Sequence, residues 1–126
     1  IIPLREYAKM PYDRDILVRL IVKKEAASFD YQSVRNTQTD FPVLTCAAAK
    51  TEAGYRFAIG ARPGKAVLFA LSNEDMKDKN VENIAEYAAK CVKEQIVTGS
   101  NTRGSAEYRN HLAGVLVRRA VCKFGE

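Results

Sequence analysis

The chain has 126 residues, of which 47% are apolar and 28% are charged, a composition typical of one globular domain and not of a disordered or fibrous protein. It contains no apolar run of about 18 residues, so we expect no membrane-spanning helix. The net charge of +5 comes from 20 basic and 15 acidic residues that are spread along the chain, and without a clustered basic face we expect no nucleic-acid partner.

The first 25 residues predict short elements on either side of a polar turn at 11–15. Residues 5–7 suit a single helical turn. Residues 16–22, I-L-V-R-L-I-V, are apolar and mostly β-branched, which favours a strand that is covered on nearly both faces. Residues 23–27 indicate a linker, so we place a domain boundary there.

The middle of the chain predicts an antiparallel sheet. Residues 29–35 alternate large apolar with polar side chains, as a half-buried strand does. A longer apolar run at 41–50 predicts a central strand, the turn around Gly54 joins it to a strand at 55–60, and a fourth strand follows at 65–71.

Two helices are expected after the strands. The first spans 81–96, with Asn80 as its N-cap and one apolar face. The second begins after an N-cap at Ser105 and is apolar on nearly every side, with a narrow polar strip at His111, Gly114 and Arg118. A helix apolar all round must be covered on more than one face, so we expect a partner surface. The fold class is therefore α+β, an antiparallel sheet of three to four strands with C-terminal helices on one face.

No group of residues in the sequence indicates catalysis or a metal site. The loop at 60–64 lacks the phosphate-binding glycine spacings and precedes a strand, so we interpret it as a structural turn. Cys46, Cys91 and Cys122 are far apart and lie in apolar runs, which indicates buried free thiols in a reducing compartment such as the cytoplasm. Arginines 103, 109, 118 and 119 are interpreted as anion-binding or interdomain residues, the latter being the commoner role.

Several motifs in order resemble the FAD subunit of the molybdenum hydroxylases, the xanthine dehydrogenase and carbon monoxide dehydrogenase family. They are I-P-L-R-E-Y at 2–7 with D-I-L-V-R-L-I-V at 15–22, D-F-P-V-L at 40–44, F-A-I-G-A-R-P at 57–63, and G-S-A-E-Y-R at 104–109. The resemblance implies that residues 1–25 are the tail of the FAD-binding domain and residues 26–126 are the C-terminal domain. It also implies a fold of three or four antiparallel strands with helices on one side.

For function, the resemblance implies electron transfer from iron–sulfur clusters through FAD to an acceptor such as NAD, with a molybdopterin subunit as a further partner. The chain starts at Ile1, so we expect a fragment whose main FAD-binding motifs lie upstream, acting as scaffold and subunit contact; a homodimer is left open. Leu17 matches a family leucine near the flavin ring. Gln32 or Ser33 matches a position where members often carry a lysine that reaches toward the flavin.

Two alternative hypotheses remain open. The chain could be a self-contained interaction or small-ligand-binding module that shares only the fold. The other alternative is nucleic-acid binding through the net charge, which predicts that the affinity depends steeply on salt concentration.

Overall fold

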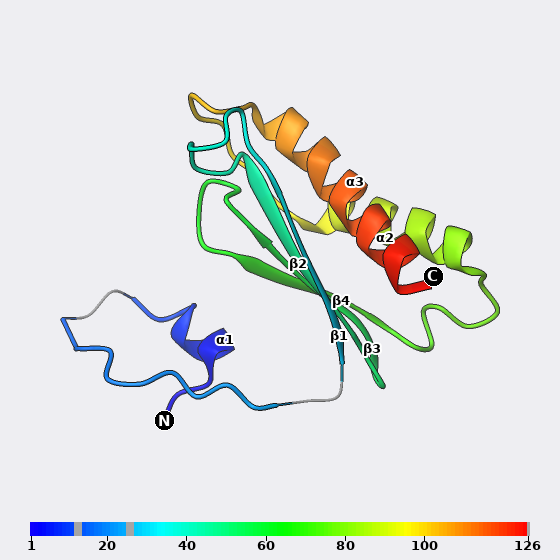
Figure 1. Cartoon of the computed structure of the whole chain (residues 1–126), viewed down its shortest axis with the longest axis horizontal. Coiled ribbons are helices and arrows are strands. Elements are labelled where there is room, and N and C mark those ends of the chain that lie inside the picture. Colours follow the sequence, from blue (N-terminus) through cyan, green and yellow to red (C-terminus); the bar gives the residue numbers. More distant parts are fainter. Residues whose placement is uncertain (12–13, 25–26, 126) are drawn as a thin grey trace.

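A computed structural model describes residues 1–11, 14–24 and 27–125. Figure 1 shows a sheet with two helices packed on one of its faces and the first residues lying to one side. The elements, in chain order, are α1 (Leu4–Tyr7), β1 (Ser28–Val34), β2 (Leu44–Thr51), β3 (Gly54–Gly60), β4 (Val67–Ser72), α2 (Val81–Gln95) and α3 (Ala106–Gly125). The expected α+β fold is confirmed.

The sheet is a meander in the order β1-β2-β3-β4, with every neighbouring pair antiparallel. The tight β2–β3 turn depends on Gly54, which has a φ of +128° and whose missing side chain would collide with the backbone oxygen of Leu71. Only glycine combines that φ with so close an approach. The predicted hairpin turn at this point is confirmed.

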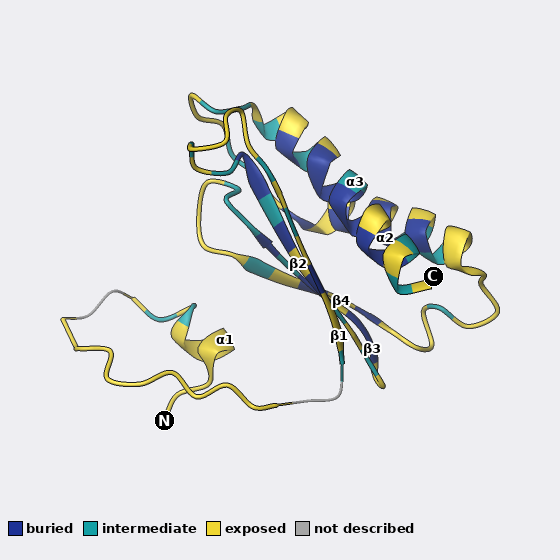
Figure 2. Cartoon of the chain, viewed as in Figure 1, coloured by how far each residue is buried: buried dark blue, intermediate teal, exposed yellow. Residues whose placement is uncertain are grey.

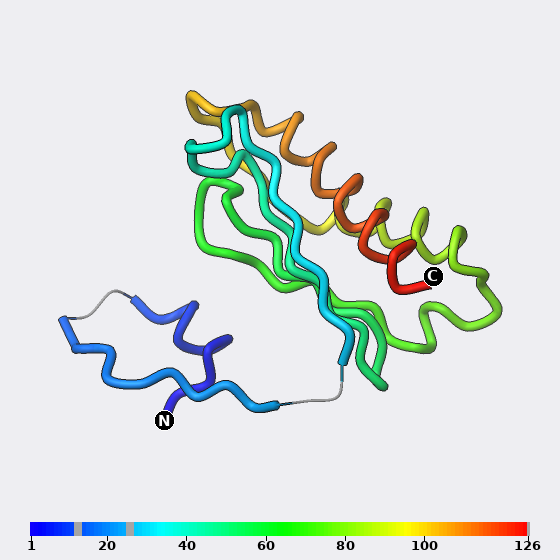
Figure 3. Tube along the Cα trace, in the orientation of Figure 1, coloured from blue at the N-terminus to red at the C-terminus, as the bar shows by residue number. Residues whose placement is uncertain are grey.

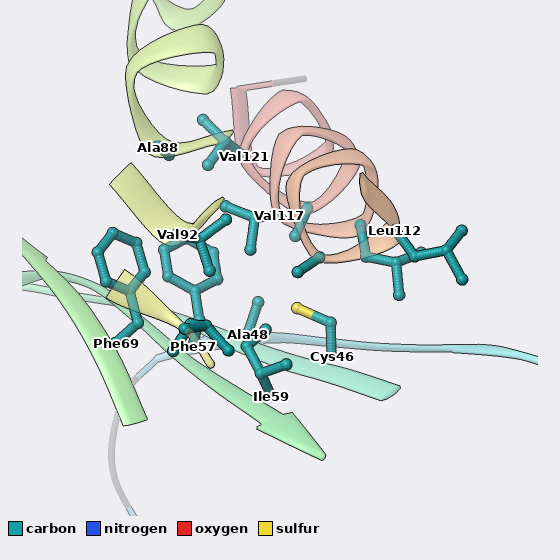
Figure 4. Packing of buried hydrophobic residues seen from close by; sticks show 14 of the residues in the cluster. Cys46, Ala48, Phe57, Ile59, Phe69, Ala88, Val92, Leu112, Val117 and Val121 are labelled. Atoms are coloured by element: carbon teal, nitrogen blue, oxygen red, sulfur yellow. The ribbon is translucent and has the colours of Figure 1, made fainter. Parts of the chain in front are cut away.

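The core lies between the sheet and the two long helices. Figure 2 shows that the helix surfaces facing the sheet are buried, and Figure 4 shows Cys46, Phe57 and Ile59 of the sheet pointing toward Val92, Val117 and Val121 of the helices. Phe57 is fully buried, with the Phe69 ring 5.7 Å away. Because β-strand side chains alternate between faces, these inward positions leave every second residue on the opposite face.

Side chains at both helix starts provide the predicted caps. The Asn80 side-chain oxygen accepts a hydrogen bond from the Asn83 amide at 2.8 Å, and the Ser105 hydroxyl accepts one from the Tyr108 amide at 3.1 Å. Each cap satisfies a first-turn amide that has no partner within its own helix.

The inference that α3 needs an outside partner to cover it is wrong. Figure 3 shows α2 and α3 running side by side in opposite directions, and α3 also packs on β2, so the chain itself covers the helix on two sides. Gly114, predicted to lie in the exposed polar strip, is buried instead, and a Cβ there would lie 3.3 Å from the Ala89 carbonyl oxygen of α2. Glycine therefore allows a close helix contact that a larger residue would tighten, while His111 and Arg118 are exposed as predicted.

The predicted strand at 16–22 is also absent. The structure places residues 14–24 outside any helix or strand, and their apolar side chains, including Leu17 at 64% exposed, remain uncovered. A strand requires hydrogen bonds to a neighbouring strand, and the sheet offers this segment none. The single helical turn at the start of the chain is confirmed as α1. The polar turn at 11–15 and the linker at 23–27 include residues 12–13 and 25–26, which lie outside the described residues.

Candidate functional site

No described helix or strand covers the sheet face opposite the helices, and we call it the open sheet face. Strand pairing aligns its side chains in rows: Phe29 with Ala49, Arg56 and Ala70; Tyr31 with Ala47, Ala58 and Leu68; Ser33 with Thr45 and Gly60. Phe29, Tyr31 and Leu68 are 69%, 63% and 64% exposed. Among the described residues this face is therefore mostly apolar, with Arg56 as its one charged member.

On β1 the apolar side chains lie on the solvent side, which is unusual for a half-buried strand. The strand itself is confirmed, but Phe29 and Tyr31 are exposed, whereas Asp30 is buried on the side of the helices. A half-buried strand normally turns its apolar residues to the core. The apolar side of β1 therefore lies on a surface that the described residues leave exposed.

The three predicted cofactor-contact residues do not lie together. Ser33 lies on the open sheet face, next in line to Tyr31, and is exposed. Gln32 points the other way, and its side-chain amide donates to the Asp30 carboxylate at 2.7 Å and to the Leu116 carbonyl of α3 at 3.3 Å. Leu17 lies in the extended segment that precedes the sheet. Of the two candidates on β1, Ser33 is the one whose side chain is free to meet a ligand.

Asp30 forms a polar contact between β1 and the end of α3. The Lys123 ammonium lies 2.5 Å from its carboxylate, whose side chain is only 5% exposed. The hydrogen bond from Lys123 lowers the pKa of Asp30, burial opposes this effect, and the bond from Gln32 adds to it. Asp30 is thus an ionised structural anchor and not a proton donor near neutral pH.

Arg109 is a buried residue whose role the sequence reasoning missed. Its guanidinium donates to the carbonyl oxygens of Val43 (2.8 Å) and Gly99 (2.7 Å), to that of Gly104, and to the Asn101 side-chain oxygen (2.5 Å). Within α3, Arg109 shares a face with Leu112 and Leu116, which was the available signal. It joins the loop before β2 to the loop before α3, and its guanidinium is fully buried among these bonds.

The cysteines and possible metal ligands are the remaining candidates for chemistry. Burial, with a smaller contribution from Asp30, raises the pKa of the Cys46 thiol to about 12, which makes it a poor nucleophile. All three cysteines are free; Cys46 is buried as predicted, whereas Cys91 and Cys122 are half-buried. Among residues 1–11, 14–24 and 27–125, no group of three or more histidines, cysteines and carboxylates is placed to bind a metal. In the same part of the chain, no helix has the length and apolarity needed to cross a membrane.

Two solved structures share this fold. Quinoline 2-oxidoreductase from Pseudomonas putida 86 superimposes with a TM-score of 0.63 at 21% identity, covering 79% of this chain and 37% of that one. Carbon monoxide dehydrogenase from Hydrogenophaga pseudoflava superimposes with a TM-score of 0.56 at 18% identity, covering 77% of this chain and 36% of that one. At these identities the likeness is one of fold.

Sequence comparison gives the family. The uncharacterized protein YgfM of Escherichia coli K12 is 30% identical over 115 residues, which are 90% of this chain and 42% of YgfM, so the chain spans less than half of that relative. The model of the CO dehydrogenase flavoprotein C-terminal domain matches residues 29–124. The matched range contains the four strands and both long helices, and omits only the first residue of β1 and the last residue of α3. The chain therefore belongs to the CO dehydrogenase flavoprotein C-terminal domain family, in agreement with its resemblance to the FAD subunit of the molybdenum hydroxylases.

Proposed function

We propose that this chain is the end of the FAD subunit of a xanthine dehydrogenase-type molybdenum hydroxylase, where it acts as scaffold and subunit contact. Residues 1–25 are then the tail of the FAD-binding domain, and 26–126 are the C-terminal domain. The intact cytoplasmic enzyme would pass electrons from iron–sulfur clusters through FAD to an acceptor, with a molybdopterin subunit as the site of substrate oxidation. The observation that carries the proposal is the open sheet face in a chain of this family.

The open sheet face has the properties of an interdomain contact. Phe29, Tyr31 and Leu68 are large apolar side chains, and the alanines between them make the surface smooth. Contiguous apolar surface of this kind is rare on free monomers and marks protein contacts. The chain is less than half as long as YgfM, which supports an upstream FAD-binding domain as the covering partner.

The residues of this chain fit a supporting contact with FAD and not the main FAD-binding site. Dinucleotide phosphates are held by backbone amides at a helix N-terminus, whereas the glycine-containing loop at 60–64 leads into β4. FAD, when bound, supplies the capacity to accept electrons and pass them on. Ser33 and Tyr31 could meet the flavin from the open sheet face, Gln32 would act only by holding Asp30, and Leu17 would pack nearby.

A self-contained interaction module is the second candidate. Its support is α3, which is covered by α2 and the sheet of the same chain and needs no outside partner. A module of this kind would still require a partner for the open sheet face, so the two proposals differ in what that partner is.

Two measurements test the proposed function. Equilibrium dialysis of the purified chain against FAD should retain no flavin absorbance, and tight binding by this chain alone would contradict the assignment of the main FAD-binding site to an upstream region. In the parent subunit, Tyr31→Lys should weaken FAD retention, because it places a charge in the proposed contact. Tyr108→Lys is the matched control, since Tyr108 is 46% exposed on α3. Equal FAD retention by both variants would contradict the role of the open sheet face.

A further inference from the structure

A second surface, at one end of the molecule, carries excess positive charge. Three loops meet there: 35–43 between β1 and β2, 61–66 between β3 and β4, and 97–105 before α3 (Figure 3). They hold the basic residues Arg35, Arg62, Lys65 and Arg103 and a single carboxylate, Asp40. We call these loops the basic end. The nearest further carboxylate in the sequence is Glu107, in the first turn of α3.

Hydrogen bonds and an ion pair join the three loops into one surface. The Arg103 guanidinium lies 2.8 Å from the Asp40 carboxylate, and the Asn36 amide donates to the Arg103 carbonyl at 3.2 Å. The Gly99 amide donates to the Arg62 carbonyl at 2.7 Å. Arg109 lies beneath and bonds to Val43, Gly99 and Gly104. The charges therefore sit on a fixed framework and not on independent flexible loops.

Most of these cations are bonded to neutral groups. Arg62 donates to the carbonyls of Lys65 (2.8 Å) and Val97 (2.7 Å), Arg35 donates to the Asp40 carbonyl, and Lys65 donates to the Met10 carbonyl at 2.9 Å. A hydrogen bond to a carbonyl oxygen holds a cationic side chain in place without neutralising its charge. Burial and the nearby Arg103 charge both lower the pKa of Arg109, which is consistent with a surplus of positive charge here.

The chemistry favours a protein partner over nucleic acid. Phe41 and Val97 are 75% and 77% exposed beside the basic residues, which provides apolar anchors between charges. The Arg103 guanidinium lies over one face of the Phe41 ring, 5.3 Å from the ring centre, which leaves only the other face for base stacking. Fixed arginines pair well with carboxylates because little side-chain freedom remains to be lost on binding.

We infer that the basic end docks an acidic protein surface on which carboxylates alternate with apolar residues. This contact is separate from the open sheet face and goes beyond the proposed function, because it names the chemistry of a partner whatever the enzyme that contains the chain. The probe is a short fluorescent peptide of alternating glutamate and leucine, titrated with the full chain by fluorescence anisotropy at low salt. A peptide with glutamine in place of glutamate serves as the uncharged comparison.

The decisive variants remove two exposed charges from each of two surfaces. Arg35→Gln with Lys65→Gln alters the basic end, and should weaken binding of the glutamate peptide by roughly tenfold. Lys90→Gln with Arg119→Gln removes the same charge from the exposed helix surface and should change affinity less than about twofold. Circular dichroism melting curves check that both double variants fold. As a second measurement, raising the salt concentration should weaken the complex of the unaltered chain with the glutamate peptide.

Three results would overturn the inference. The two double variants could weaken binding equally, which would show that only the net charge of the chain matters and not the position of the charges. The glutamine peptide could bind as well as the glutamate peptide. Single-stranded poly-uridine RNA could bind more tightly than the glutamate peptide, which would identify the basic end as a nucleic-acid surface.

Discussion

The two faces of one sheet differ in what covers them. The inner face carries Phe57, Ile59 and Leu71, and α2 and α3 bury it. The open sheet face carries four alanines among larger and polar residues, with Phe29 and Tyr31 on the edge strand, and no helix of the described chain buries it. The same backbone alternation produces both. Their difference separates the residues that hold this chain together from those available to another protein surface.

The difference is sharpest on β1, where the charged residue faces inward. Asp30 is acceptable there because Lys123 and Gln32 satisfy its carboxylate; an unpaired buried charge would be strongly unfavourable. Phe29 and Tyr31, in contrast, are not buried by the described residues of the chain. Four substitutions, from the largest expected effect to the smallest, test whether the inner side is structural and the open side is not.

Arg109→Met should have the largest effect. It retains much of the side-chain volume but leaves the buried Val43 carbonyl without its donor and removes the bonds to the half-buried carbonyls of Gly99 and Gly104. A hydrogen bond with a charged donor contributes about 1.5–3 kcal/mol, so we expect the free energy of unfolding to fall by about 4 kcal/mol or more. Urea unfolding followed by circular dichroism measures this, and a loss below about 1 kcal/mol would show that the loops do not depend on Arg109.

Phe57→Ala on the inner face should destabilise the chain by about 3–5 kcal/mol, the usual cost of emptying a fully buried aromatic site. Phe57 has no exposed surface and lies beside both Tyr55 and Phe69. The same urea experiment measures the loss. A value as small as that of the outer-face variant Phe29→Ala would remove the energetic distinction between the two faces.

Asp30→Asn should cost about 1 kcal/mol at neutral pH, because it removes the charge that attracts Lys123. The pKa of Asp30 is lowered in the folded chain, so the stabilisation is complete above the unfolded value of 3.8 and is lost as the pH falls through the folded value. Stability of the parent chain should therefore fall more steeply below about pH 4 than stability of the variant. Parallel acid dependences would show that the contact contributes no pH-dependent stability.

Phe29→Ala should have the smallest effect, within about 1 kcal/mol, since its side chain is 69% exposed and only strand preference is reduced. Its effect should instead be seen in association: the variant should bind less of a hydrophobic fluorescent dye than the parent chain. A loss of stability that matches Phe57→Ala would mean that the open face is already structural in the isolated chain.

Local sequence patterns predicted most elements but not which surfaces they bury. The alternation at 29–35 correctly predicted a strand, yet it could not show that the helices would lie over Asp30 and leave Tyr31 uncovered. Residues 16–22 have a strand-like sequence and form none here, because a strand exists only with a partner. Arg109 was interpreted as a binding residue because no local pattern shows that its guanidinium is buried against the preceding loop and the distant Val43 carbonyl.

The sequence by itself determined the order of the elements, the caps at Asn80 and Ser105, the turn at Gly54 and, through its motifs, the family. These depend on neighbouring residues, whose preferences are expressed locally. Only the tertiary structure decided that α2 and the sheet cover α3, that Gly114 is a helix contact, and that Ser33 and not Gln32 lies on the open sheet face. Those outcomes depend on which distant surfaces meet, and burial is a property of the whole chain.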